Sequence, residues 1–154
     1  MDKYTAMVDW LRGCPAMAGV LNFQAGKAKA DTMQITTEGG DVQQSRKYID
    51  GSEERSFNFV VAFYKPVLGN PYRPNTENHN ITALLDVRAL MDWIREQEQA
   101  HNYPAFPDGC VVDTVQTTHD EPVLAWVDTV NYSPPVAKYT VTIRATYMDY
   151  SRTI

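Results

Sequence analysis

Three histidines and two cysteines are the residues of this sequence best suited to nucleophilic, acid–base or metal chemistry. The histidines are His79, His101 and His119, and no two of them have the i, i+4 spacing of a helical metal site. None lies beside a cysteine in a metal-ligand pattern. We therefore interpret all three as solvated surface residues, and we expect no metal and no cofactor.

The two cysteines, Cys14 and Cys110, are far apart in the chain. The opening stretch, MDKYTAMVDWLRG, lacks the apolar segment of a secretory signal, so two free thiols are favoured over a disulfide. Cys14 follows a predicted helix, and the negative end of a helix dipole does not activate a thiol. Cys110 opens a predicted strand, where the expected role is that of a small buried side chain.

Two carboxylate pairs, Glu53–Glu54 and Asp120–Glu121, fall in predicted turns. A general acid–base pair needs shielding from water to shift a pKa, and turns provide little shielding. The glycine-containing stretch EGGD at 38–41 matches neither of the common phosphate-loop patterns. The sequence therefore predicts no catalytic residues and no enzyme, and a small cytoplasmic enzyme is kept only as the more distant alternative.

The length and charge of the chain narrow the class of protein further. Its 154 residues are typical of a single domain, 1–154. Proteins that grip nucleic acid through its phosphates concentrate lysine and arginine, because the released counterions supply much of the affinity. The net charge here is -5, so we expect no sequence-specific nucleic-acid binding. An apolar run of about 18 residues, the minimum for a spanning helix, does not occur, and we expect no membrane partner.

Hydrophobic periodicity divides the chain into helices and strands. Apolar residues recur at helical spacing in 3–12 and 81–98, and Asn80 is the expected N-cap of the second helix. Strand patterns occupy seven other stretches, at 19–23, 32–37, 46–49, 55–64, 111–118, 123–131 and 138–150. The stretch 65–80 is rich in proline and asparagine, and we expect a long functional loop there.

The predicted fold class is α+β: a mostly antiparallel sheet of about five or six strands, with one long helix packed on it and a short N-terminal helix. The last three strands are expected to form an antiparallel meander, with HDEP (119–122) as the turn between the first two.

The strand 55–64 alternates two largely apolar faces. Phe57, Phe59 and Phe63 share one face, and Ala62 and Tyr64 lie on the other. Such a strand is expected to be central in the sheet, or to have its second face covered by a helix or by another subunit. Together with the missing catalytic set, this pattern favours a subunit that assembles.

Four stretches, in order along residues 10 to 149, resemble a family of small phage and prophage structural proteins of the tail-terminator type. The first is Trp-Leu followed by Cys-Pro at 10–15, and the second is the hairpin KYIDGSEERSFNFVVAF at 47–63. The third is 75–109, with its Asp-Trp-Ile helix and the loop that follows, and the fourth is the strand-rich ending, 111–149.

The resemblance implies a virion protein that forms a ring, most simply a hexamer, on the head-proximal end of the tail tube. Such a ring stops tube polymerisation and joins the tube to the head connector. The implied partners are further copies of the chain, the tail tube protein and the head–tail connector protein, and the implied location is the virion, with assembly in the host cytoplasm. The nearer alternative is another neck or head-completion protein of the same particle.

Within that resemblance the hairpin is interpreted as an assembly element, with polar residues offered for pairing across a subunit boundary. The alternative is that these residues simply solvate a turn. The predicted interface residues are Arg46, Lys47, Asp50, Gly51, Ser52, Arg55, Tyr64, Tyr72 and Arg73.

Overall fold

The structure is a computed structural model that describes residues 2–17, 20–23, 32–38, 46–66, 77–128 and 136–151. Most of the predicted loop 65–80 lies outside the described residues, and so do Tyr72 and Arg73 of the predicted interface. The stretch 38–41 is described only at Glu38.

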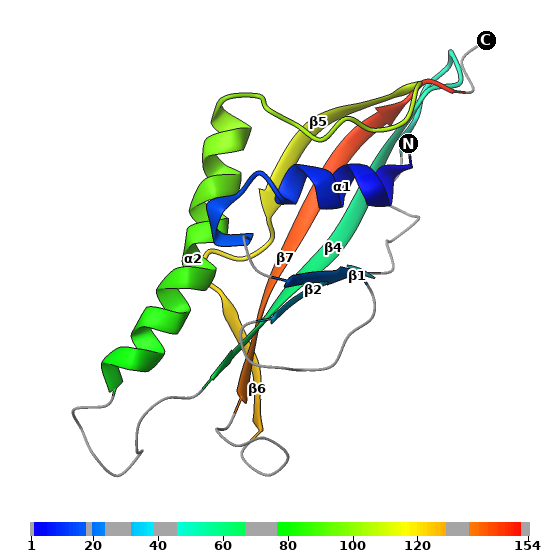
Figure 1. Ribbon diagram of the computed structural model, residues 1–154. Coiled ribbons are helices and arrows are strands. Elements are labelled where there is room, and N and C mark those ends of the chain that lie inside the picture. Colours follow the sequence, from blue (N-terminus) through cyan, green and yellow to red (C-terminus); the bar gives the residue numbers. More distant parts are fainter. Residues whose placement is uncertain are drawn as a thin grey trace.

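A sheet of seven strands forms the body of the protein (Figure 1). The strands are β1 (Val20–Phe23), β2 (Thr32–Glu38), β3 (Arg46–Lys47), β4 (Glu53–Pro66), β5 (Cys110–Thr117), β6 (Val123–Asp128) and β7 (Val136–Asp149). Their spatial order is β1-β2-β4-β7-β5, with β3 also paired to β4 and β6 also paired to β7. Every pairing is antiparallel except that of β1 with β2. The predicted α+β class with a mostly antiparallel sheet is therefore confirmed.

The predicted meander of the last three strands is wrong. β5 and β6 do not pair with each other, because both pair with the same edge of β7. β5 lies along Ile143–Asp149 and β6 along Val136–Thr140, so the two strands run in the same direction. Thr118 still donates to the Thr142 carbonyl of β7 at 3.0 Å, and residues 119–122 then connect β5 to β6 along the same edge, whereas a hairpin turn would reverse the chain.

Two α-helices and one short 3-10 helix are described: α1 (Lys3–Leu11), η1 (Pro15–Met17) and α2 (Glu77–Gln99). Asp2 caps α1, since its carboxylate accepts a hydrogen bond from the backbone N–H of Thr5 at 2.8 Å. The prediction of Asn80 as N-cap is wrong, because α2 already begins at Glu77, whose negative charge suits a helix N-terminus. Within the described part of the chain, neither helix has the length and hydropathy needed to cross a bilayer.

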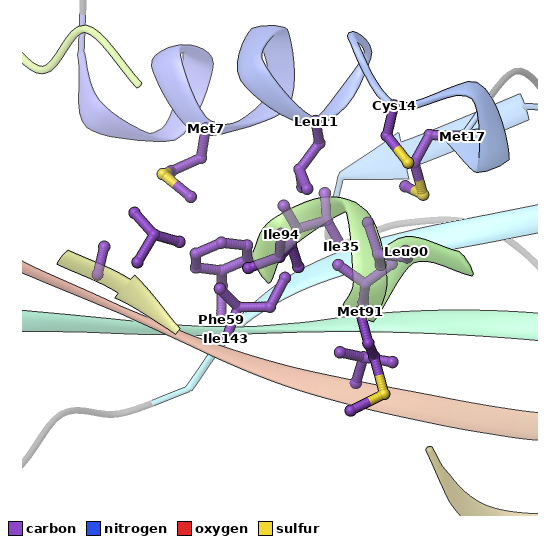
Figure 2. Packing of buried hydrophobic residues seen from close by; sticks show 14 of the residues in the cluster. Met7, Leu11, Cys14, Met17, Ile35, Phe59, Leu90, Met91, Ile94 and Ile143 are labelled. Atoms are coloured by element: carbon purple, nitrogen blue, oxygen red, sulfur yellow. The ribbon is translucent and has the colours of Figure 1, made fainter. Parts of the chain in front are cut away.

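The main core lies between one face of the sheet and the helices (Figures 1 and 2). Met7 and Leu11 of α1 and Leu90 and Ile94 of α2 point toward Phe59 of β4, as Figure 2 shows. The predicted core face of β4 is confirmed, since Phe57, Phe59, Val61 and Phe63 are all buried in this cluster. β4 is also central in the sheet, with β2 and β3 on one side and β7 on the other.

A smaller cluster lies on the opposite face of the sheet. It consists of Ala62, Tyr64 and Val136, with the half-buried Trp126 packed against them. The Tyr64 hydroxyl donates a hydrogen bond to Gln34 Oε1 at 2.9 Å, and its ring centroid lies 6.0 Å from that of Trp126. Tyr64 is only 5% exposed, so it belongs to this cluster and is not offered at the surface as the interface prediction required.

Two leucines of α2 provide a matched test of the core. Leu90 is fully buried, whereas Leu85 in the same helix is 60% exposed. Leu90→Ala is expected to lower the free energy of unfolding by about 2–5 kcal/mol, because it removes packed atoms and leaves a cavity. Leu85→Ala is expected to change it by less than about 0.5 kcal/mol. Chemical denaturation measures both values, and equal losses would contradict the placement of α2.

Candidate assembly surface

The residues best suited to nucleophilic, acid–base or metal chemistry form no metal-binding group within the described part of the chain. No set of three or more His, Cys, Asp or Glu side chains there could hold a metal ion. His101 and His119 are exposed, and His101 Nδ1 lies 3.3 Å from the Tyr103 hydroxyl. His79 belongs to the first turn of α2, where side chains are outside the described set.

Both cysteines are free, as predicted. Cys14 is 2% exposed, and burial raises the pKa of its thiol. Cys110 opens β5 as predicted and is half-buried; burial, followed by the nearby charge of Asp149, raises the pKa of its thiol. Lys3 lies on the same side of the sheet, with its ammonium 4.8 Å from the centroid of the Phe57 ring. Neither thiol is activated by its surroundings.

The two thiols are expected to differ in their reactivity toward iodoacetamide. Cys110 is expected to be alkylated first, because Cys14 is almost inaccessible. Since both pKa values are raised, the rate at Cys110 should keep rising with pH beyond the ordinary thiol range, as thiolate forms late. Peptide mass spectrometry after timed labelling measures this, and faster labelling at Cys14 would contradict the burial of Cys14 in the core.

A shallow hollow of about 360 Å³ lies between α2 and β5. Met91, Ile94 and Val115 contribute its apolar lining, and Arg95, Glu98 and Asp120 contribute its charges. Glu98 already accepts a hydrogen bond from the backbone N–H of Val115 at 2.8 Å. This carboxylate therefore fastens α2 to the edge of the sheet.

The hairpin between β3 and β4 is a tight, internally bonded turn. Gly51 N–H donates to the Tyr48 carbonyl at 3.1 Å, and Gly51 has a φ of 92°, which favours glycine there. The Asp50 carboxylate accepts hydrogen bonds from the backbone N–H and the hydroxyl of Ser52, at 2.9 and 2.6 Å. These two bonds lower the pKa of Asp50. Asp50, Gly51 and Ser52 thus shape the turn itself.

Glu53 is the charged residue that this hairpin buries, with a side chain only 10% exposed. It begins β4, so the prediction that Glu53 and Glu54 lie in a turn is wrong. Arg55 Nε donates to Glu53 Oε2 at 2.9 Å, and Lys47 Nζ lies 3.9 Å from Oε1. Although burial lowers the pKa of Arg55, Glu53 raises it overall. Glu53 and Arg55 therefore neutralise each other within the chain.

The rest of the hairpin is open to solvent. Arg46 is exposed, and the Lys47 side chain is 77% exposed despite its long contact with Glu53. Ile49 is fully exposed at the tip and Tyr48 is 46% exposed. The predicted polar residues of the hairpin are thus brought together at one end of the sheet, where Arg46, Lys47 and Arg55 are exposed together with Asp50, Tyr48 and Ile49.

A second surface was not singled out from the sequence as an interaction site. β6 has an outer edge that pairs with no other described strand. Val123, Leu124 and Val127 are each between 42 and 53% exposed, and Ala125 is exposed too. An exposed apolar edge strand offers both unpaired backbone groups and hydrophobic side chains, so it invites pairing with another strand. A sequence signal existed, because VLAWVD is almost wholly apolar, but the same signal is typical of a buried strand.

Arg88 of α2 holds the connection that precedes β6. Its guanidinium donates to the Asp120 carbonyl and lies 2.7 Å from the Glu121 carboxylate. Asp92, one turn further along the helix, lies 3.4 Å away. These acidic partners raise the pKa of Arg88, with Glu121 contributing most. The Asp120–Glu121 pair was predicted to sit in a simple turn. The Glu121 carboxylate and the backbone carbonyl of Asp120 instead connect residues 118–122 to the helix.

Removing this tie should loosen the start of β6. In Arg88→Gln, the backbone amides of Thr118 to Leu124 are expected to exchange hydrogen faster, because the connection loses both its charged partner and its hydrogen bond. Arg95→Gln is the matched control, since Arg95 is exposed on the same helix and is not a partner of this connection. Hydrogen-exchange mass spectrometry measures the difference. Unchanged exchange in Arg88→Gln would show that residues 118–122 keep their conformation without Arg88.

Comparison with known proteins adds no family: no protein-family model matches the chain, and no curated protein matches it either.

Proposed function

We propose that this protein is a virion structural subunit of the tail-terminator type, which forms a ring on the head-proximal end of a tail tube. In this role it binds further copies of itself, the tail tube protein and the head connector protein. It adds to the growing tube end through one face and offers no equivalent face to another ring of tube protein, so growth stops.

The observation that carries the proposal is the apolar edge of β6. Four of its six residues are exposed, and all four are apolar. Proteins that remain monomeric usually protect such an edge with charges, proline or a covering segment. β6 carries one charge, Asp128, at its end. In a subunit that assembles, an edge of this kind can pair with a strand of another subunit.

The sequence resemblance and the layout of the helices support the same role. The four resembling stretches lie on α1, on the β3–β4 hairpin, on α2 with the loop after it, and on β5 to β7. In the proposed ring, α2 is the helix that carries the Asp-Trp-Ile motif of the resemblance, and it packs with α1 on one face of the sheet (Figure 1). The opposite face and the two sheet edges are then the surfaces through which a ring could be built.

The decisive functional experiment uses purified tail tubes and the purified protein. Negative-stain imaging is expected to show a cap at one end of each tube, and polymerising tube protein in its presence is expected to give shorter tubes. The control is the same quantity of protein heated beyond its unfolding transition. Bare tube ends and unchanged tube lengths at a large excess of protein would overturn the proposal.

Binding to isolated heads or portal complexes instead would favour the neck or head-completion alternative. That outcome is measured by the same negative-stain imaging on a second sample, in which heads or portal complexes replace the tubes.

A further inference from the structure

The sheet has two lateral edges that are unpaired among the described strands. One edge consists of β5 and β6, which lie end to end along β7. The other is formed by β1 and, near the hairpin, by β3. A ring that closes requires two different edges that fit each other, because each copy must offer one to the copy before and the other to the copy after.

The directions of the strands suit such a contact. β6 is antiparallel to β7, β7 to β4, and β4 to β2, while β1 is parallel to β2. Within one sheet β6 and β1 therefore run in opposite directions. When a second copy is placed beside the first in the same orientation, its β1 meets β6 as an antiparallel neighbour, which is the more stable kind of pair.

The heights of the two edges also match. β6 and β1 lie on the same cross-strand rows, and one such row runs through Asn22, Gln34, Ala62, Thr140 and Val123. The contact would thus need no slip along the strands.

Charge is complementary at the other end of the same edges. Arg46 of β3 is exposed, and it shares a row with Val111 of β5. The exposed Asp113 follows two residues later. β1 stands one strand further out than β3, a step of about 4.8 Å. When β6 meets β1, the width of one strand is left unfilled between β5 and the neighbouring β3, so these two strands lie two spacings apart, about 9.6 Å. The long side chain of Arg46 can span that distance to Asp113.

We propose that β6 of one copy pairs in antiparallel fashion with β1 of a second copy, and that Arg46 of the second copy meets Asp113 of the first. This inference rests on the proposed self-assembly and names the two surfaces that meet.

Disulfide trapping tests the pairing directly. Asn22→Cys and Val123→Cys place one thiol on each edge in the same row, so the double variant is expected to give a ladder of cross-linked multimers under mild oxidation. An equal mixture of the two single variants is expected to give dimers only. Each single variant alone, and the wild-type chain with Cys14 and Cys110, are expected to stay at the background level.

The outcomes separate this inference from the proposed function. Dimers formed by Val123→Cys alone would show a two-fold contact and overturn the inference. A wild-type protein that is oligomeric by light scattering, with no ladder from the double variant, would also overturn it while leaving self-assembly intact. A wild-type protein that is monomeric at every concentration and leaves tube ends bare would overturn both.

A charge exchange gives an independent reading of the same contact. Arg46→Glu and Asp113→Arg are each expected to weaken self-association at least tenfold, and the two changes combined in one chain are expected to restore it. Arg12→Glu is the control, since Arg12 is the exposed C-cap residue of α1, belongs to neither edge strand, and is paired with Asp9. Equal weakening by all three single variants, or no recovery in the combined one, would speak against the Arg46–Asp113 contact.

Discussion

The pairing of β4 with β7 is the constraint on which the rest of the structure depends. The two strands are in register over their whole length, from Glu53 opposite Asp149 to Pro66 opposite Val136. The side chains on their core face, among them Phe59 and Ile143, form the apolar surface on which both helices pack (Figure 2). Their length also creates the two edges, because each long strand has room along its outer side for two shorter ones: β2 and β3 on β4, and β5 and β6 on β7.

The buried and the exposed parts of this arrangement have different roles. The hairpin satisfies its own polar groups, as when Ser52 bonds to Asp50 and Arg55 to Glu53, and it leaves cations and an apolar tip outside. At the other edge of the sheet, Arg88 holds the connection between β5 and β6, so that β6 returns to β7 and presents its outer edge. A rigid sheet with one apolar edge and a basic corner is well suited to repeated contact with copies of itself.

Sequence patterns predicted the elements well but their partners poorly. The alternation of Phe57, Phe59 and Phe63 revealed the core face of β4, because side chains alternate with a period of two in any strand. The meander was wrong because pairing is set by contacts between distant residues, and nothing local distinguishes a turn at 118–122 from a step back to the same strand. β6 was missed as a surface for the same reason: VLAWVD is as apolar as a buried strand, and only its place at the edge exposes it. Tyr64 was expected at a subunit boundary, yet Trp126 and Gln34, far away in the chain, bury it.

Electron cryomicroscopy of tail tubes incubated with the protein tests the central claim most directly, namely that this sheet closes into a ring by edge contacts. The expected reconstruction shows one closed ring at one end of the tube, with β6 of each subunit beside β1 of the next. Subunits bound singly, or a ring in which β6 faces solvent, would contradict it.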